Sequence, residues 1–445
     1  MNRRQFLHSS AVTMSSLAVA ARPAGAQPAG GGALDAKGAL ALARARREEL
    51  VDLLSRLIAV SSPLGESAEA AQRVVADYLN TRGYRSDLTT DDPTAYTSHP
   101  DYMAPATPYP APAVNLVARA AAHPSRVGLF AHIDTEKAGP GWTSAPLTAT
   151  VRDGRLYGLG AADDKGGVAA MAVAATILQA SGRPSPIVMS LHGKGGGSRG
   201  SLPTFARLRE FSQVLYVHPA ETGHGFADIK HVVRGVLDLR LTVTGWRGNA
   251  RELGSPDSAS FSEGGDALQA ALAMVDAWRA GPLKSAEVNV GEMTAGDRVG
   301  SVPAQARARV RVLFDEPRAF GEVLADARRE CERVAATRSR GDRRITVTLE
   351  RDGLGANYAS VPWDSPACRV LRASIEDVTG RAPTSYPTHF AGDIRYPIRL
   401  AGVPAFGMGS LAGGFYGPDE WVDIDDLVRL VAVVMVCADR WAALG

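Results

Sequence analysis

The sequence predicts an α/β protein, with a helix-flanked, mostly parallel sheet that is interrupted by a smaller inserted domain. Short apolar runs alternate with helical patterns over residues 34–234 and again over residues 351–445, and this alternation is typical of a parallel sheet covered by helices. Residues 235–350 are predicted to follow the order βαββαβ, which is typical of a split sandwich with one open sheet face. A chain of 445 residues is also too long for one compact core.

The first part of the sheet domain begins with helical patterns over residues 34–60 and 67–82. Residues 89–113 are rich in Pro, Tyr, Asp and Thr, which predicts a long irregular loop of the kind that often rims a binding cleft. Strands and helices then alternate. Strands are predicted at 115–119, 127–131, 187–191 and 214–217, and helices at 165–180 and 201–210.

The inserted domain is predicted from a change of pattern near residue 234, where strands begin to alternate between apolar and polar residues. Its strands are expected at 236–244, 287–293, 306–313 and 344–349, and its helices at 265–278 and 319–336. The second part of the sheet domain ends in a helix over residues 424–444.

Residues 1–26 predict a twin-arginine export signal. Arg3 and Arg4 are followed by an apolar stretch over residues 11–21 and by a small-residue cleavage site at 24–26. The apolar stretch is too short and too rich in Ala and Ser to span a bilayer comfortably, which favours cleavage over a membrane anchor. We therefore expect a periplasmic or secreted protein that has no membrane partner after cleavage.

The charge balance gives no case for nucleic acid or an anionic membrane as a partner, because the net charge is only +2 and single-sign runs are short. The expected partner is a small-molecule or peptide-like substrate. Cys331, Cys368 and Cys437 follow no metal-binding spacing, so we expect them to be small buried side chains.

Two motifs together predict a divalent-metal site. His132 and Asp134 stand two apart at the carboxyl end of an apolar strand, where open α/β sheets bind ligands. Asp163 precedes a glycine-rich helix start and can reach the same crevice. A neutral imidazole and carboxylates suit zinc, with manganese or cobalt as alternatives. Asp134 is expected to accept the other ring proton of His132. If only one motif were present, a simpler explanation would suffice: His132 could be a buried structural histidine, and Asp163 could cap a helix.

The chain resembles the co-catalytic zinc peptidase family of aminoacylase, glutamate carboxypeptidase, acetylornithine deacetylase and succinyl-diaminopimelate desuccinylase. The resemblance rests on His132-Ile133-Asp134, on the run GLGAADDKGG at 158–167, and on PDEWV at 418–422. It implies that the insert is a lid and dimerisation domain, that the protein is a homodimer, and that His132 binds a first metal. It also implies that Asp163 bridges two metals and is followed by a cis peptide bond.

The chain departs from the family pattern at the second metal. Where the family has two adjacent glutamates, a general base and a ligand of the second metal, this chain has Lys194 and Gly195. The last ligand, normally a histidine, is Tyr416, whereas His218 stands at the position of a first-metal ligand. The first metal thus keeps His132, Asp163 and His218, and one metal is expected. In the insert, Asn249 replaces a histidine that reaches the partner subunit's site.

The residue that replaces the glutamate base is left open between Glu221, three residues beyond His218, and Lys194, which could lose its proton beside a metal or stay charged and bind a substrate anion. His192 and His224 are weaker candidates, and His389 is expected in the substrate pocket. The glycines at 195–197 are expected to permit a tight turn rather than to cradle an anion.

These features predict an exported, metal-dependent hydrolase that cleaves an amide or related C–N bond, in which the metal activates water and polarises a carbonyl. Two alternatives stay open. One is hydrolysis of a non-peptide C–N bond, such as deamination of an aromatic amine. The other is a binding protein that has kept the fold and lost turnover.

Overall fold

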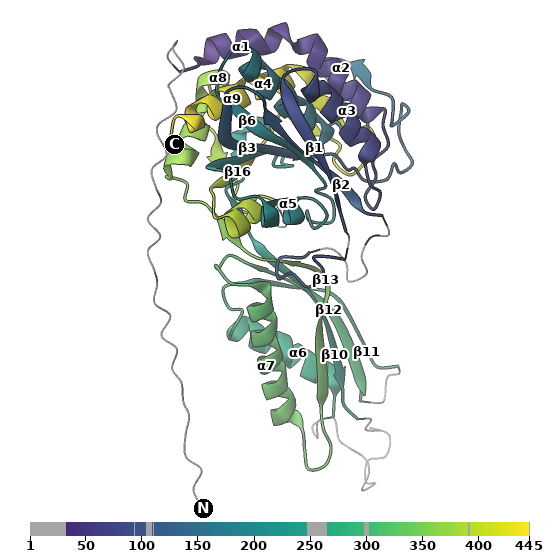
Figure 1. The fold of residues 1–445 in the computed structure, drawn as a ribbon. Coiled ribbons are helices and arrows are strands. Elements are labelled where there is room, and N and C mark those ends of the chain that lie inside the picture. The colour runs from purple at the N-terminus through teal and green to yellow at the C-terminus, as the bar shows by residue number, and fades with distance from the viewer. Residues whose placement is uncertain are drawn as a thin grey trace, which may run out of the picture. The chain divides into compact units, whose positions relative to one another are not determined.

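The computed structural model describes residues 33–92, 94–103, 109, 111–246, 265–297, 302–389 and 392–444. The predicted export signal and Asn249 lie outside these residues. The predicted fold class is confirmed: a central, mostly parallel sheet with helices, interrupted by a βαββαβ insert (Figure 1). Among the described residues, no helix is both long and apolar enough to cross a membrane.

The central sheet has six strands in the order β1-β2-β6-β3-β7-β16. Strands β6, β3, β7 and β16 run parallel, whereas β2 is antiparallel to both β6 and β1. The strands are β1 (Tyr84–Asp91), β2 (Ala113–Ala120), β3 (Pro124–His132), β6 (Ser185–Leu191), β7 (Gln213–Val217) and β16 (Ala405–Met408). The last strand follows the insert in sequence, so both parts of the sheet domain build one sheet.

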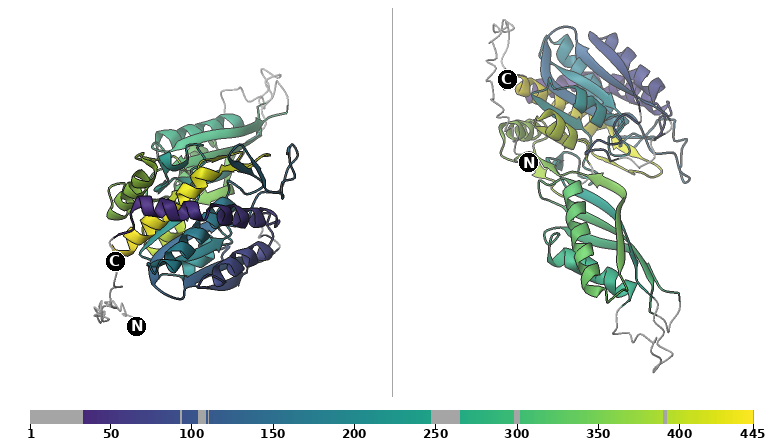
Figure 2. Two further views of the ribbon diagram at one scale, coloured as in Figure 1. Left: turned by 90° about the horizontal axis from the view of Figure 1, so that it is seen from above. Right: turned by 60° about the horizontal axis from the view of Figure 1, so that its bottom comes forward.

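Helices cover both faces of this sheet, and most of them lie on one face (Figure 1). On that face α1 and α9 lie side by side (Figure 2, left). The helices of the sheet domain are α1 (Ala36–Ala45), α2 (Arg47–Ile58), α3 (Glu69–Asn80), α4 (Lys165–Ala180), α5 (Ser201–Arg207), α8 (Pro366–Thr379) and α9 (Ile424–Ala442). Successive side chains of a strand point to opposite faces. Leu129 therefore joins the core under α4 and α9, and Phe130 joins the core under α5.

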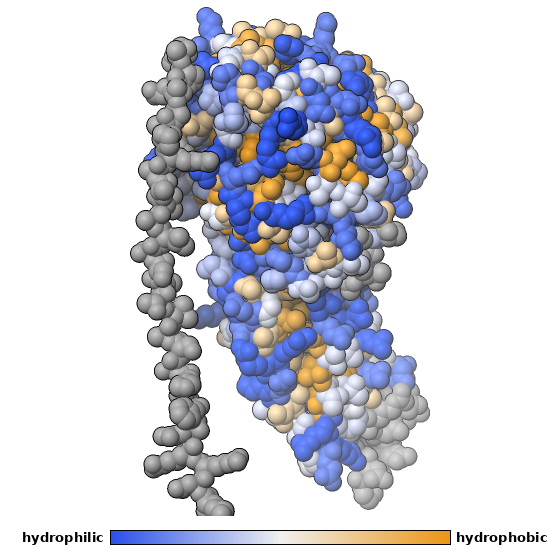
Figure 3. Space-filling view, in the orientation of Figure 1, coloured by the Kyte–Doolittle hydropathy of each residue, from blue (hydrophilic) through white to orange (hydrophobic). Residues whose placement is uncertain are grey.

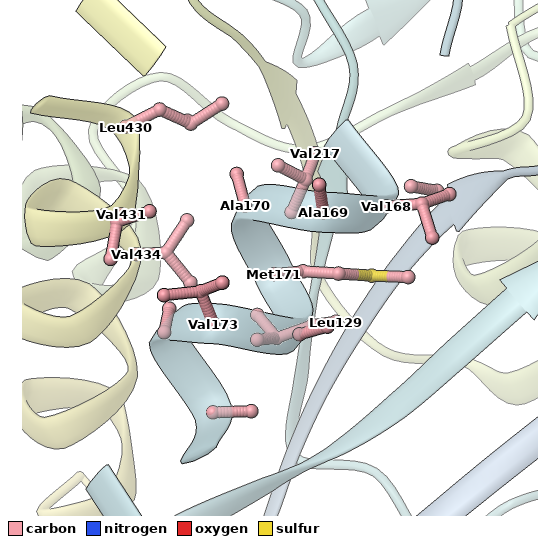
Figure 4. Close-up of a cluster of buried hydrophobic side chains, with 14 of the residues drawn as sticks. Leu129, Val168, Ala169, Ala170, Met171, Val173, Val217, Leu430, Val431 and Val434 are labelled. Atoms are coloured by element: carbon pink, nitrogen blue, oxygen red, sulfur yellow. The ribbon is translucent and has the colours of Figure 1, made fainter. Parts of the chain in front are cut away.

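Helix α4 lies deepest in the sheet domain, because almost every residue from Lys165 to Leu178 is buried. Small side chains such as Ala169 and Ala170 let the helix approach the strands closely, with Val217 on one side and Val434 of α9 on the other (Figure 4). Its amino end is thereby fixed at the carboxyl ends of the parallel strands, which is where the predicted metal site lies.

The insert consists of β10 (Gly235–Thr244), α6 (Ala267–Ala280), β11 (Glu287–Ala295), β12 (Gln305–Phe314), α7 (Phe320–Arg338) and β13 (Thr346–Ala356). Its antiparallel sheet has the order β11-β12-β10-β13. Helices α6 and α7 pack on one face, where Trp278 and Val312 are buried. Hydrophilic side chains cover much of the outer surface of α7 (Figure 3).

Ion pairs line the other face of the insert's sheet. The Arg311 guanidinium binds the Asp238 carboxylate at 2.7 Å, and Arg309 binds Asp352 at 3.0 Å. In each pair the arginine and the aspartate come from different strands. This face is therefore a polar surface with ion pairs between strands rather than an apolar one.

The elements differ from the prediction in three instructive places. Strand β1 was not predicted, because its residues are mostly polar and exposed at the edge of the sheet. The predicted first helix is two helices, which meet at Arg46. Strand β13 runs to Ala356, beyond the expected end of the insert at residue 350, because it stays paired to β10 across a bulge, as far as the pair Val236 and Ala356.

Candidate metal centre

The predicted ligands meet at the carboxyl ends of adjacent parallel strands. His132 is the last residue of β3, His218 follows β7, and Asp163 lies two residues before α4 begins. Strand β3 pairs with β6 on one side and with β7 on the other, so the loops that follow these strands converge. The peptide bond between Asp163 and Asp164 is cis, as the resemblance implied.

His132, Asp163 and His218 offer one ligand atom each within 4.8 Å of one another, and all three are buried. The Asp163 Oδ1 atom lies 2.7 Å from the His132 Nε2 atom and 3.0 Å from the His218 Nε2 atom. The three side chains line a cleft of about 480 Å³. Two imidazole nitrogens and a carboxylate oxygen are a donor set that fits a divalent metal such as zinc.

The charges around the cluster favour the metal-binding forms of Asp163 and His218. For His132, burial lowers the pKa, but the Asp163 and Asp134 carboxylates outweigh it and raise the pKa well above its usual value, so a metal must displace a proton from this imidazole. Burial and the Lys230 ammonium lower the pKa of His218 to about 4, which keeps the imidazole neutral. Burial opposes ionisation of Asp163, but Lys194 and His132 outweigh it and hold the pKa of that carboxyl well below its usual value. Asp163 is therefore an anion and His218 a neutral base, as metal ligands must be.

Asp134 fixes the metal-site loops, although not through the contact expected from the sequence. The His132 Nδ1 atom lies 2.9 Å from the main-chain oxygen of Asp134 and 3.5 Å from its Oδ1 atom. The Asp134 carboxylate instead accepts hydrogen bonds from the main-chain N–H groups of Gly193, at 2.8 Å, and Lys194. Asp134 thereby joins the His132 loop to the loop that follows β6.

Lys194 lies in the cleft with its ammonium bound to the Asp163 Oδ2 atom. Its Nζ atom is 3.7 Å from Glu136 and lies over the Tyr416 ring, 4.5 Å from the ring centroid. Burial would lower the pKa of Lys194, but the Asp163 carboxylate raises it above its usual value. Lys194 is thus held as a cation.

Glu221 also lies in the cleft, with its Oε1 atom 3.9 Å from the His218 Nε2 atom. The Tyr416 hydroxyl donates a 2.8 Å hydrogen bond to the Glu221 Oε2 atom. Glu221 has a positive φ of 64°, which is uncommon for a residue with a side chain and turns it back toward the cluster. Of the two candidates for the base, only Glu221 is a carboxylate, and it borders the metal ligands.

The structure separates the remaining histidines. His389 lines the cleft. His192 is buried beneath the loop, where its Nε2 atom lies 2.9 Å from the Ser67 oxygen. The His224 side chain is 68% exposed and contacts Asp228. His192 and His224 are therefore not among the residues that line the cleft.

The glycines at 195–197 form a tight turn at the rim of the cleft, each with a φ near 70°. A side chain at Gly195 would meet the Tyr109 hydroxyl at 2.9 Å, and one at Gly196 would overlap Met103. The positive φ values and this crowding explain why these positions hold glycine. The tight turn is the one expected from the sequence.

Two buried residues that support the site were not predicted. The Glu420 carboxylate accepts three 2.8 Å hydrogen bonds from the main-chain N–H groups of Gly160, Ala162 and Asp163. The Lys230 Nζ atom lies 2.7 Å from the His218 Nδ1 atom. Glu420 belongs to the PDEWV run, which marked the resemblance but gave no role to this side chain.

The fold and the donor set together define a metal-dependent hydrolase. The model of peptidase family M20/M25/M40 matches residues 128–440, and the chain belongs to this family.

Similar proteins agree with this assignment. Succinyl-diaminopimelate desuccinylase of Gluconacetobacter diazotrophicus is 29% identical over 348 residues, which are 74% of this chain and 85% of that protein. The desuccinylase of Methylobacterium radiotolerans is 29% identical over 380 residues, 81% of this chain and 88% of that protein.

Solved structures share the fold at low identity. Aminopeptidase PepT of Bacillus cereus matches with a TM-score of 0.66 and 16% identity, over 89% of this chain and 99% of that chain. YXEP of Bacillus subtilis, a dinuclear metal-binding peptidase of the M20 family, matches with a TM-score of 0.61 and 13% identity, over 90% of this chain and 99% of that chain.

Proposed function

We propose that this protein hydrolyses an amide or related C–N bond of a small or peptide-like substrate with one divalent metal ion. The expected ion is zinc. The observation that carries the proposal is the convergence of His132, Asp163 and His218 at the floor of the cleft. The names of the desuccinylase relatives support an amide as the bond that is cleaved.

The single ion is supported by the residues at the second position. Gly195 has no side chain, and the Tyr416 hydroxyl is hydrogen-bonded to Glu221. Three protein ligands with an open position are typical of a catalytic mononuclear site.

A metal at this centre supplies a Lewis acid that polarises a carbonyl and lowers the pKa of water. The chain supplies the groups that move protons. We assign Glu221 as the general base, because its carboxylate borders the ligand cluster and Lys194 is already bound to Asp163 as an ammonium ion. The Tyr416 hydroxyl orients Glu221 through its 2.8 Å hydrogen bond.

Two variants separate the ligand role from the base role. His132→Ala should abolish metal binding and turnover, because two remaining ligands hold zinc weakly. Glu221→Gln should keep about one metal per chain and lower kcat by about 10²-fold or more, the usual contribution of a general base. Metal content is measured by elemental mass spectrometry, and turnover with N-acylated amino acids and arylamines.

The outcomes are distinct. A His132→Ala chain that retains its full metal content would refute the ligand assignment. Glu221→Gln with unchanged kcat would remove Glu221 as the base. A wild-type chain without metal, even after reconstitution, would favour the non-catalytic binding role.

The same proposal includes export and pairing. The twin-arginine pattern of residues 1–26 supports a periplasmic or secreted location. The edge strand β11, which pairs only with β12 among the described residues, supports a homodimer.

A further inference from the structure

Lys194 differs from a surface lysine in how completely its position is fixed. Its main-chain N–H donates to the Asp134 carboxylate at 3.2 Å, and the side chain is only 8% exposed. The three glycines that follow turn the chain back, so that the Gly197 N–H donates to the Gly193 oxygen at 2.7 Å. The backbone that carries Lys194 is thus tied to Asp134, two residues beyond the predicted ligand His132.

The two oxygens of Asp163 face different partners. The Oδ1 atom lies between the Nε2 atoms of His132 and His218, where the predicted metal would bind. The Oδ2 atom is bound by the Lys194 ammonium. The carboxylate thus has one oxygen for the predicted metal and one for a side-chain cation.

We propose that the Lys194 ammonium permanently replaces the second metal ion, as a built-in cation on the free oxygen of Asp163. The inference rests on the proposed function, because it assumes a metal at the first position. The neighbours of the ammonium are those of a cation site: the Asp163 carboxylate, Glu136 at 3.7 Å and the face of the Tyr416 ring at 4.5 Å. Gly195 has no side chain, and Tyr416 offers no charged ligand to a competing ion.

This replacement changes what the site can do. A tethered ammonium carries one charge, does not exchange with solution and donates hydrogen bonds. It lines the cleft beside the ligand cluster, so it can stabilise negative charge that develops on a substrate oxygen. The site therefore keeps two cationic centres while it depends on the supply of only one metal ion.

Metal affinity tests the inference without relying on turnover. Two cations that share one carboxylate repel each other, so removal of the ammonium should strengthen metal binding. We expect Lys194→Met to bind the same number of zinc ions as wild type, one per chain, with a Kd lower by about tenfold. The Kd is measured by competition with a chromophoric zinc chelator at constant pH.

Two control variants isolate the charge. Lys194→Arg keeps a cation at the same position and should keep the wild-type Kd. Lys137→Met removes an exposed lysine of the neighbouring loop and should leave the Kd unchanged.

Each outcome bears on a different claim. One zinc per chain with an unchanged or weaker Kd in Lys194→Met would overturn this inference and leave the proposed function intact. Two zinc ions in the wild type would also overturn it. No zinc in the wild type would overturn the proposed function and, with it, this inference.

Discussion

Asp393 is a buried carboxyl group in the wall of the cleft, and its charge depends on pH in the range where the enzyme would work. Its Oδ2 atom accepts a 2.6 Å hydrogen bond from the Ser201 hydroxyl, while the Arg395 guanidinium approaches its Oδ1 atom only to 4.0 Å. Burial raises the pKa of Asp393 from 3.8 to about 6. The folded chain therefore keeps this proton to a higher pH than the unfolded chain does.

This raised pKa predicts a loss of stability as pH rises. Below pH about 4, Asp393 is protonated in the folded and the unfolded chain. Between pH about 4 and 6 the unfolded chain ionises first, so the free energy of unfolding falls, by about 3 kcal/mol at most. The variant Asp393→Asn cannot ionise and should escape this part of the loss.

The measurement is urea unfolding of the metal-free protein at pH about 4 and about 7. The stability of Asp393→Asn relative to wild type should increase between the two pH values. Asp77→Asn, at an exposed position of α3, is the control and should follow wild type. Equal pH dependence in Asp393→Asn and wild type would show that folding does not raise the pKa of Asp393.

Single residues could be predicted where the chemistry is local in sequence. His132 and Asp134 stand two apart, and Asp163 adjoins a glycine-rich helix start. The spacing alone therefore indicated that these side chains lie at the same crevice. The contact between Lys194 and Asp163 joins two different loops, and Glu420 reaches Asp163 from the far end of the chain. Such partners depend on the tertiary fold, which is why the role of Lys194 stayed open and that of Glu420 was missed.

Helix α4 has room only for a glycine at position 167, in its first turn beside the metal ligands. A Cβ atom added to Gly167 would lie 1.9 Å from the Val217 oxygen and 2.4 Å from the Asp164 Oδ1 atom. The Val217 oxygen belongs to the main chain of the strand that leads to His218, so it cannot move away without moving that metal ligand.

We therefore expect Gly167→Ala to lower stability by about 3 kcal/mol or more, as overpacking does in a rigid core, and to weaken zinc binding. The same substitution at Gly321, where nothing lies within 4 Å of the added Cβ, should instead stabilise α7 by about 0.5–1 kcal/mol. Thermal unfolding compares the two. A Gly167→Ala chain as stable as wild type would contradict the close packing of α4.

Whole elements followed from the sequence where the pattern was apolar and periodic. Helix α4 was predicted over residues 165–180, the bounds that it has. Strand β1 was missed because its residues are mostly polar, and its place is set by pairing with β2 along its full length. The hydrophobic pattern within one segment does not show which other strand that segment pairs with.

At the scale of the whole molecule, the insert presents an open sheet edge. Among the described residues, β11 pairs only with β12, and most of its side chains are exposed. Unpaired N–H and C=O groups along an edge strand favour pairing with a second chain.

We expect the mature protein recovered from the periplasm to have about twice the mass of one chain in light scattering, and His132→Ala to leave that mass unchanged, because the ligand lies in the other domain. Replacement of Arg3 and Arg4 by Lys should keep the precursor in the cytoplasm. A monomer at micromolar concentration, or a periplasmic Lys–Lys variant, would contradict the respective expectation.

The position of β16 in the central sheet has a consequence for biosynthesis. Ala405 pairs with Val214, so the edge of β7 stays open until the ribosome has made the whole insert and the residues up to β16. The sheet that holds His132 and His218 therefore cannot close segment by segment as the chain emerges; it closes only after the insert and β16 have been made.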